Sequence, residues 1–410
     1  MWPAGAASSC RFQHRRSWVV ELAATCPACG RVGLDGFHRQ TNVPANSCLL
    51  LGSRKEATEF PTGELELGFC PDCGFITNTR FDPDLAEYSE RYEETQAFSD
   101  RFVTFARSLA RDWVDRYGLT GKKVLEVGCG KGEFLVMMAE AGIGHGVGID
   151  PGVHPERIDA PAGDRIEWIA DFYSDAFAHL EADAIVCRHT LEHIGPVGDF
   201  MRMIRRNIGD RLDTIVLFEL PDTQRVLDEV AFWDVYYEHC SYFSAGSLAR
   251  LFEHTGFEVL DLYYAYDDQY LILEARPLPS PGAAHPWSGD DMDALRRGVE
   301  HFRSGYGATM SAWTDRLAAL GREEGTAVIW GAGSKGVAFL SAVGENVSAA
   351  VDINPHKHGM FMAGTGHRIV APQDLPDLAP DLVIAMNPIY LDEIQHDLDR
   401  LGIEARLEAV

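Results

Sequence analysis

Two short cysteine turns near the start of the sequence have the residue types and spacing of a metal site. Cys26 and Cys29 stand in Cys-Pro-Ala-Cys-Gly, and Cys70 and Cys73 stand in Cys-Pro-Asp-Cys-Gly. Each turn brings two thiolates toward one ion, and a tetrahedral set of four thiolates favours zinc. Because four protein ligands leave no position for a catalytic water, we predict a structural Zn2+. The alternative is a set of unpaired or redox-active thiols.

A glycine-rich turn further along the chain has the pattern of a cofactor loop. Glu126 lies in an apolar run, Gly-Cys-Gly-Lys-Gly follows at 128–132, and Asp150 closes the next run 20 residues after Gly130. An acid at that position can accept hydrogen bonds from both ribose hydroxyls of a nucleoside cofactor, and Asp171 can accept from an adenine amino group at the end of the third strand. Bound NAD, or no cofactor, are the alternatives. We assign to the cofactor the residues at this edge of the predicted sheet: Glu126, Gly128, Gly130, Gly132, Asp150, Asp171, Phe172 and His189.

The segment 236–244, Tyr-Tyr-Glu-His-Cys-Ser-Tyr-Phe-Ser, crowds an imidazole, a carboxylate and several hydroxyls together. Glu238 and His239 are predicted to act as a base pair that faces the cofactor edge, with Glu238 or a tyrosine hydroxyl orienting the imidazole. His193 follows the fourth apolar run at the same edge. The alternative is an aromatic-rich entry to a helix over 245–254, in which Ser244 is the N-cap.

A second glycine loop, Gly331-Ala-Gly-Ser-Lys-Gly336, follows the apolar run 327–330, and Asp352 lies 21 residues after Gly331. This pattern alone indicates a dinucleotide. Lys335 inside the turn is unusual for that purpose and suits the diphosphate of a substrate. We therefore assign Gly333, Ser334 and Lys335 to substrate binding, with a purely structural role or bound NAD as alternatives.

Alternating apolar runs and helical periodicity predict an α/β protein with a parallel sheet. We expect strands at 123–127, 146–149, 166–169, 184–187, 214–219 and 271–274, a proline-rich linker over 276–287 and a long helix over 292–322. The predicted organisation is a disordered tail (1–20), a small β module around zinc (21–85), a Rossmann-like central domain (86–275), the linker and long helix (276–322) and a second Rossmann-like domain (323–410).

The composition narrows the classes of partner. The chain has 410 residues, a formal charge of -26 and 46% apolar residues, which is ordinary for a folded protein of two or three domains. So acidic a surface disfavours nucleic acid and anionic membranes. We find no run of about 18 apolar residues and no signal peptide. With nine cysteines of which five stand alone, the sequence predicts a reducing, cytoplasmic location.

These features together resemble the zinc-containing nucleotide-sugar C-methyltransferases, which depend on S-adenosylmethionine. The resemblance rests on the paired cysteine turns, the Glu-x-Gly-x-Gly-x-Gly loop, the segment 236–244 and the C-terminal α/β domain, with 44–47 and 351–359 in support. It implies methylation of a ring carbon next to the ketone of a dTDP-4-keto-deoxysugar. By motif, His239 would be the base, with Tyr236 and Glu238 beside it, and the further active-site residues would be His193 and Tyr92.

One stretch departs from the family pattern. Where the family has His-Gly-Gly-Ser-Leu-Arg, this chain has Tyr266-Asp-Asp-Gln-Tyr270, so we expect a different wall facing the sugar. Two alternatives therefore stay open: transfer to oxygen or nitrogen of another metabolite, and a non-catalytic scaffold that binds nucleotide-sugars. The sequence does not define the oligomeric state, and a monomer is compatible with it.

Overall fold

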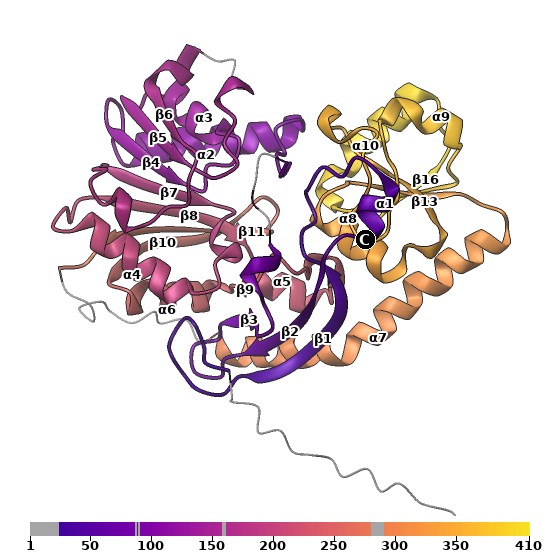
Figure 1. Cartoon of the computed structure of the whole chain (residues 1–410), viewed down its shortest axis with the longest axis horizontal. Coiled ribbons are helices and arrows are strands. Elements are labelled where there is room, and N and C mark those ends of the chain that lie inside the picture. Colours follow the sequence, from indigo (N-terminus) through magenta and orange to yellow (C-terminus); the bar gives the residue numbers. More distant parts are fainter. Residues whose placement is uncertain (1–23, 87, 89–90, 158–160, 280–290) are drawn as a thin grey trace, which may run out of the picture.

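The structure is a computed structural model that describes residues 24–86, 88, 91–157, 161–279 and 291–410. Figure 1 shows two α/β lobes, one magenta and one orange to yellow, joined along one side by a curved β ribbon and a long helix. The predicted tail over 1–20 lies outside the described residues. No helix within the described ranges is both long and apolar enough to cross a membrane.

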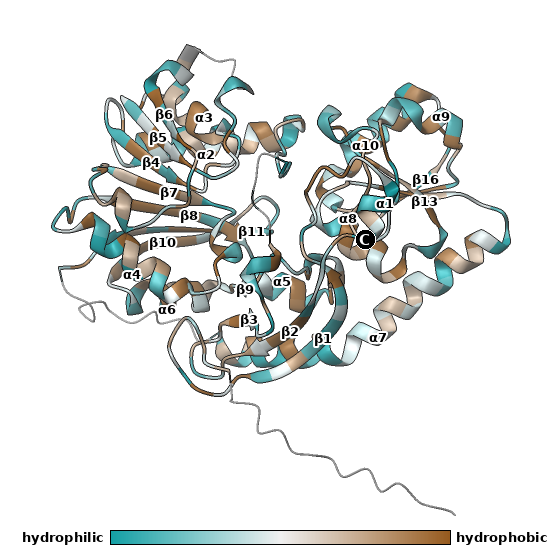
Figure 2. Cartoon of the chain, viewed as in Figure 1, coloured by the Kyte–Doolittle hydropathy of each residue, from teal (hydrophilic) through white to brown (hydrophobic). Residues whose placement is uncertain are grey.

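The central lobe is built on a seven-stranded sheet with the order β10-β11-β8-β7-β4-β5-β6. Its strands are β4 (Lys123–Val127), β5 (His145–Ile149), β6 (Ile166–Ile169), β7 (Ala184–Arg188), β8 (Ile215–Pro221), β10 (Phe257–Ala265) and β11 (Tyr270–Pro277). The six predicted strands are present, with ends that move by up to three residues. Figure 2 shows much of this sheet in the brown of apolar side chains, as expected for strands covered on both faces.

The prediction of a wholly parallel sheet is wrong at one edge. β11 is antiparallel to both of its neighbours, β8 and β10, and β10 was not among the predicted strands. The two strands form a hairpin around Tyr266, Asp267 and Asp268, which all have left-handed backbones with φ of 53 to 57°. Glycine, asparagine and aspartate are the usual residues of such a turn, so Asp267 and Asp268 fit it, whereas Tyr266 is unusual with a left-handed backbone.

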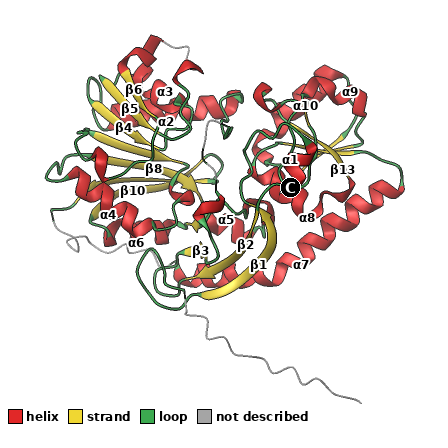
Figure 3. Ribbon diagram, in the orientation of Figure 1, coloured by secondary structure: helices red, strands yellow, loops and turns green. Residues whose placement is uncertain are grey.

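Helices cover both faces of the central sheet (Figure 3). α2 (Asp100–Arg116) and α3 (Glu133–Ala141) share an apolar core with one face, and α4 (Val197–Ile208) and α6 (Ala245–His254) share another core with the opposite face. The predicted helix over 245–254 is confirmed, and Ser244 caps it in a capping box with Ser247.

The N-terminal segment forms a four-stranded antiparallel sheet with the order β1-β2-β3-β9. Its strands are β1 (Asp35–Pro44), β2 (Thr62–Phe69), β3 (Ile76–Asn78) and β9 (Ser241–Tyr242), and the short helix α1 (Arg54–Thr58) lies between β1 and β2. β9 comes from the segment 236–244 of the central lobe. This pairing ties the N-terminal sheet directly to the segment that we predicted to carry the base.

The C-terminal lobe has a five-stranded parallel sheet with the order β14-β13-β12-β15-β16. Its elements are β12 (Ala327–Trp330), α8 (Ser334–Val343), β13 (Val347–Val351), β14 (Ile369–Val370), α9 (Leu375–Leu378), β15 (Leu382–Ala385), α10 (Leu391–Leu401) and β16 (Arg406–Ala409). α7 (Met292–Arg322) matches the predicted long helix and contacts α5 (Thr223–Asp228), β1 and α8. One apolar core runs through the N-terminal sheet, α7 and this lobe.

The predicted linker over 276–287 needs one correction. Arg276 and Pro277 end β11 and pair with Glu258 and Phe257 of β10, so they belong to the sheet. Proline is tolerated there because it stands at the end of the strand. Residues 280–290 lie outside the described residues.

Candidate active site

A cavity of about 1400 Å³ lies between the two lobes. Gly128, Asp150 and His239 of the central lobe and Lys335 and Asn387 of the C-terminal lobe all line it. The carboxyl ends of β4, β5 and β7 open into it, which is where ligands of open α/β sheets bind. The structure thus brings both predicted glycine loops and the predicted base to one space.

The first glycine loop follows β4 in the conformation that the pattern predicts. Gly128 has a left-handed backbone (φ 71°), and a Cβ at this position would overlap the side chain of Thr190. Asp150 accepts hydrogen bonds from Gly130 N at 3.0 Å and Gly152 N at 2.7 Å, so its carboxylate is fixed at the end of β5. Gly132 is the N-cap of α3 and contributes to the loop geometry.

Glu126 has a side-chain oxygen without a hydrogen-bond partner. Its side chain is buried, and Oε2 has no hydrogen-bond partner in the structure. Burial raises the pKa of Glu126 to about 8. An orphaned acid in the cavity wall fits a positively charged group of a ligand, which would restore the carboxylate form.

Asp171 and Phe172 both line the cavity, but they do not end the third strand as predicted. β6 ends at Ile169, and the two residues lie in the loop that follows. The Phe172 ring is 61% exposed, which is high for a large apolar side chain. An exposed ring at this position fits contact with a flat aromatic base.

His189 lies in a buried ionic network at the end of β7. Its Nε2 donates to Glu219 at 3.1 Å, and Arg188 Nε donates to the same carboxylate at 2.5 Å. Burial alone would lower the pKa of His189, but Glu219 and Glu192 outweigh it and raise the pKa to about 9. His189 is therefore an imidazolium at neutral pH. Glu219 was not among the predicted site residues, because it belongs to no recognisable sequence motif.

The predicted base, His239, lies among aromatic and imidazole rings. Its Nε2 is 3.2 Å from the Tyr236 hydroxyl, and its ring centroid is 4.7 Å from that of His193. His193 Nδ1 is 2.9 Å from the hydroxyl of Tyr88, a residue that we did not predict. Burial, followed by the positive charges of His193, His189 and Lys335, lowers the pKa of His239 well below its ordinary value. His239 is therefore neutral and able to accept a proton at neutral pH.

Glu238 does not orient His239, contrary to one of our two expectations. Its carboxylate accepts hydrogen bonds from Asn46 Nδ2 at 3.2 Å, from the backbone and hydroxyl of Ser47, and from the Tyr92 hydroxyl at 3.0 Å. The two neighbouring side chains therefore have separate sets of partners. Tyr236 is the group that contacts the imidazole. Tyr92 is connected to the site by its hydrogen bond to Glu238.

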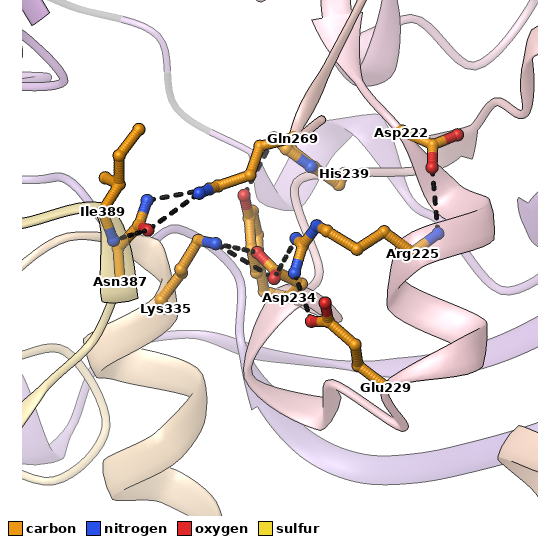
Figure 4. Close-up of polar contacts among 10 residues, drawn as sticks. Asp222, Arg225, Glu229, Asp234, His239, Gln269, Lys335, Asn387 and Ile389 are labelled. Carbon is orange, nitrogen blue, oxygen red and sulfur yellow. Dashed lines mark hydrogen bonds and ion pairs between the residues drawn. The ribbon is translucent and has the colours of Figure 1, made fainter. Parts of the chain in front are cut away.

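The second glycine loop adjoins the same cluster. Ser334 Oγ lies 3.3 Å from Glu238 Oε1, and Lys335 Nζ lies 3.0 Å from the Asp234 carboxylate (Figure 4). Asp352, the acid that a dinucleotide would need, accepts from Ala332 N at 2.9 Å and lies 3.5 Å from Lys357 Nζ. Asp352 thus fixes the second glycine loop in the same way that Asp150 fixes the first.

In the stretch 266–270, which we expected to form a different wall facing the sugar, the two carboxylates do not line the cavity. Asp267 and Asp268 are exposed in the hairpin turn, while Gln269 and Tyr270 line the cavity. The Gln269 and Asn387 amides exchange two hydrogen bonds of 2.9 Å, so the hairpin contacts the C-terminal lobe. The turn faces outward because its left-handed residues reverse the chain at this point.

The four predicted metal ligands converge. Cys26 Sγ lies 3.7 Å from Cys73 Sγ, Cys29 Sγ lies 3.7 Å from Cys70 Sγ, and one candidate ligand atom from each lies within 4.8 Å of the others. Zn–S bonds of about 2.3 Å give a tetrahedral S···S edge of about 3.8 Å, so the donor set fits Zn2+. The cluster packs in the core beneath α4 and α6, away from the cavity.

Two family models match the chain in the order of its lobes. Residues 102–262 match a "Methyltransferase domain", and residues 295–404 match a "C-methyltransferase C-terminal domain". The chain is therefore an S-adenosylmethionine-dependent methyltransferase with a Rossmann-like central domain.

Among curated proteins, the chain is similar to "C-methyltransferase NovU" of Streptomyces niveus, with 27% identity over 369 residues, 84% of this chain and 85% of the relative. It is also similar to a ubiquinone biosynthesis O-methyltransferase of Erwinia tasmaniensis, with 36% identity over 95 residues, 21% of this chain and 38% of that relative.

Among solved structures, the mitomycin 7-O-methyltransferase MmcR matches with 20% identity and a TM-score of 0.35, over 44% of this chain and 55% of that chain. A didemethyltoxoflavin N1-methyltransferase of Burkholderia thailandensis matches with 17% identity and a TM-score of 0.32, over 44% and 81%.

Proposed function

We propose that this methyltransferase transfers a methyl group to a carbon atom next to the ketone of a nucleotide-linked keto-deoxysugar. The match of residues 295–404 to a C-methyltransferase C-terminal domain supports a carbon acceptor. So does the similarity to a relative named C-methyltransferase, which aligns over most of its length. The keto-sugar is the substrate class that the family resemblance implies.

The observation that carries the proposal is a neutral, buried histidine in the wall of a cavity shared by two lobes. Methylation at carbon next to a ketone needs a base that removes a weakly acidic proton and donors that hold the enolate oxygen. We assign the base to His239, because burial and neighbouring positive charges lower its pKa and keep the imidazole neutral, with Nε2 3.2 Å from the Tyr236 hydroxyl. Tyr236 and His193 are the donors in the same cluster.

Cofactor binding falls to the loop after β4 and its neighbours. Glu126 would face a positive group, Asp150 the ribose hydroxyls, and Phe172 the flat base. S-adenosylmethionine, when bound, supplies an electrophilic methyl group. The task of the remaining residues is alignment, since reacting atoms must approach to about 3–3.5 Å.

We also infer that Cys26, Cys29, Cys70 and Cys73 hold a structural Zn2+. The spacing of the thiols supports this, and so does their distance from the cavity in the core beneath α4 and α6. Because all four ligand positions come from the protein, the ion takes no part in the reaction.

The test determines which atom of the substrate receives the methyl group. The purified chain is incubated with S-adenosylmethionine carrying a ¹³C-labelled methyl group and a dTDP-4-keto-6-deoxysugar, and the product is analysed by NMR. We expect the labelled carbon to couple to a ring carbon next to the ketone. A label attached to oxygen or nitrogen, or no transfer to any keto-sugar, would overturn the proposal.

A further inference from the structure

An acid in the wall of the cavity, Glu192, has a carboxylate oxygen without a hydrogen-bond partner. Glu192 lies in η5 (Leu191–His193), the short helix after β7, and its side chain is buried. Its Oε1 lies 3.7 Å from His189 Nδ1, which is too far for a hydrogen bond, and its Oε2 meets no donor among the described residues. Buried polar atoms are nearly always paired, so this oxygen points to a donor that is absent from the resting site.

The Glu192 carboxylate belongs to a compact group with two imidazoles. A carboxylate oxygen of Glu192, a ring nitrogen of His193 and a ring nitrogen of His239 all lie within 4.8 Å of one another. The Tyr88 hydroxyl adjoins the group, 2.9 Å from His193 Nδ1. All four side chains line the cavity between the lobes. Glu192 is therefore close enough to His239 to interact with a charge on its ring.

Contacts between two segments fix the position of Glu192 relative to His239. Cys240, the residue after His239, places its Sγ 3.7 Å from Glu192 O. The next residue, Ser241, donates through Oγ to Ile194 O at 2.7 Å. η5 and the start of β9 are thus joined on both sides of the carboxylate, and the two side chains keep their separation.

The surroundings of His239 favour a neutral imidazole and oppose the imidazolium that proton removal creates. The ring is buried, and the positive charges of His193, His189 and Lys335 lower its pKa. Burial raises the pKa of Tyr236 well above its ordinary value, so the hydroxyl beside Nε2 carries no charge. A base in such surroundings accepts a proton poorly unless an anion stabilises the product. The titratable groups that face the ring from the described segments around it are His189, His193, Tyr236, Tyr242 and Lys335.

Glu192, rather than Glu238, is the acid in a position to stabilise this product. The Glu238 carboxylate accepts hydrogen bonds from Ser47 N at 3.2 Å and from the Tyr92 hydroxyl at 3.0 Å, so both of its oxygens are used. Glu192 has a free oxygen and lies in one group with the imidazole. We propose that Glu192 is a positioning residue, which accepts a hydrogen bond from His239 once His239 has taken the proton of the substrate.

The proposed step balances without a further reactant. The C–H bond next to the ketone breaks, its proton bonds to the His239 imidazole, and its electron pair forms the enolate. The imidazolium carries N–H on both ring nitrogens, and Glu192 accepts from one of them until the proton passes to water. A carboxylate beside the histidine of serine proteases stabilises the imidazolium by the same kind of contact. The inference rests on the proposed function, because it takes His239 to be the base.

The test measures methylation of a dTDP-4-keto-6-deoxysugar by the full chain from about pH 4 to 8, in the wild type and in Glu192→Gln, which removes the charge and keeps the shape. We expect kcat to fall by about 10- to 100-fold, less than for loss of the base itself, with KM within about threefold. The acid limb of the profile should move to lower pH by about one unit, because the imidazolium loses a nearby negative charge. Structural damage that admits water would move it the opposite way, toward the ordinary pKa of histidine.

Three variants control for indirect effects. Glu133→Gln removes a carboxylate from the wall of the same cavity, where Glu133 accepts from Thr95 Oγ1 at 2.7 Å, and it should leave the acid limb in place. Glu192→Asp keeps the charge but withdraws it by one methylene, so its kcat should lie between those of wild type and Glu192→Gln, and it gives a second measure if the glutamine variant unfolds. In a His189→Asn background, Glu192→Gln should shift the acid limb by the same amount, because the contact with His239 is direct.

A kcat of Glu192→Gln within about threefold of wild type, an acid limb that moves upward, or a shift that disappears in the His189→Asn background would overturn the inference. So would a second zinc ion per chain that is lost in Glu192→Gln, because the group would then hold a metal. Methylation at carbon that depends on His239 and not on Glu192 overturns this inference and leaves the proposed function standing. Methylation that does not depend on His239 overturns both.

Discussion

Replacing His189 with asparagine should remove a pH-dependent part of the stability of the central lobe. The pKa of His189 is about 9 in the folded chain, against about 6.5 for an ordinary histidine, because Glu219 and Glu192 favour the imidazolium. A raised pKa stabilises the fold fully below pH 6.5, and this stabilisation is lost as the pH rises through 9. Asparagine is a suitable replacement, since it tolerates the left-handed backbone of this residue (φ 47°).

The magnitude follows from the difference between the two pKa values. About 2.5 units at about 1.4 kcal/mol each give up to about 3 kcal/mol, and the 26% exposure of the side chain makes this an upper value. Urea unfolding of wild type and His189→Asn at pH 6, 7.5 and 9.5 gives the difference in unfolding free energy at each pH. We expect the difference to shrink by about 2–3 kcal/mol from pH 6 to 9.5.

The control is His179→Asn, which removes an exposed imidazole whose Nδ1 contacts Ala176 O. It shows how much of the effect comes from losing a histidine at the surface. A His189→Asn difference that stays constant over the pH range would show that His189 is not an ion in the folded chain. It would refute the network of Arg188, His189 and Glu219 as described.

Three further predictions test other parts of the site. His239→Asn should lower turnover by about 10²- to 10⁴-fold with little change in S-adenosylhomocysteine affinity. The acid limb of the wild-type pH–rate profile should lie below pH 6.5, because burial lowers the pKa of His239. Turnover of the variant within a few-fold of wild type would assign the base to another residue. Binding of S-adenosylmethionine should release a proton from Glu126, so the affinity of the wild type should rise toward pH 8. In Glu126→Gln, the affinity should depend less on pH, as measured by calorimetry in two buffers. An equal pH dependence in both proteins would contradict this. Cys70→Ser should lose about one zinc per chain by metal analysis and should lower the unfolding midpoint, and an unchanged metal content would refute the zinc site.

The parts of the fold that depend on local pattern could be predicted from the sequence. Apolar runs gave five strands of the central sheet in their correct direction, and the long periodic segment gave α7. Ser244 was recognisable as a cap because a hydroxyl before a periodic segment satisfies free N–H groups. The two cysteine turns could be recognised from the sequence for the same reason. Each turn is a short local motif, and a site of four cysteines needs only two of them.

The parts that depend on contacts between distant segments could not. The reversed strand β11 follows a turn whose first left-handed residue is Tyr266, a residue type that sequence rules do not favour there. Glu238 turns toward Ser47, and Lys335 toward Asp234, because the N-terminal and C-terminal segments enclose the central loop. Such contacts join residues about 100 or 200 positions apart, and one sequence carries no record of them.

The proposed mechanism requires His239 to remove a proton from a carbon next to the ketone of the substrate. The most direct measurement is exchange of that proton for deuterium in D2O, followed by NMR, with S-adenosylhomocysteine in place of the methyl donor. We predict exchange at one ring carbon in the wild type and its loss in His239→Asn, with binding of the nucleotide retained. Equal exchange in both proteins would contradict the role of His239, and no exchange in the wild type would contradict the deprotonation itself.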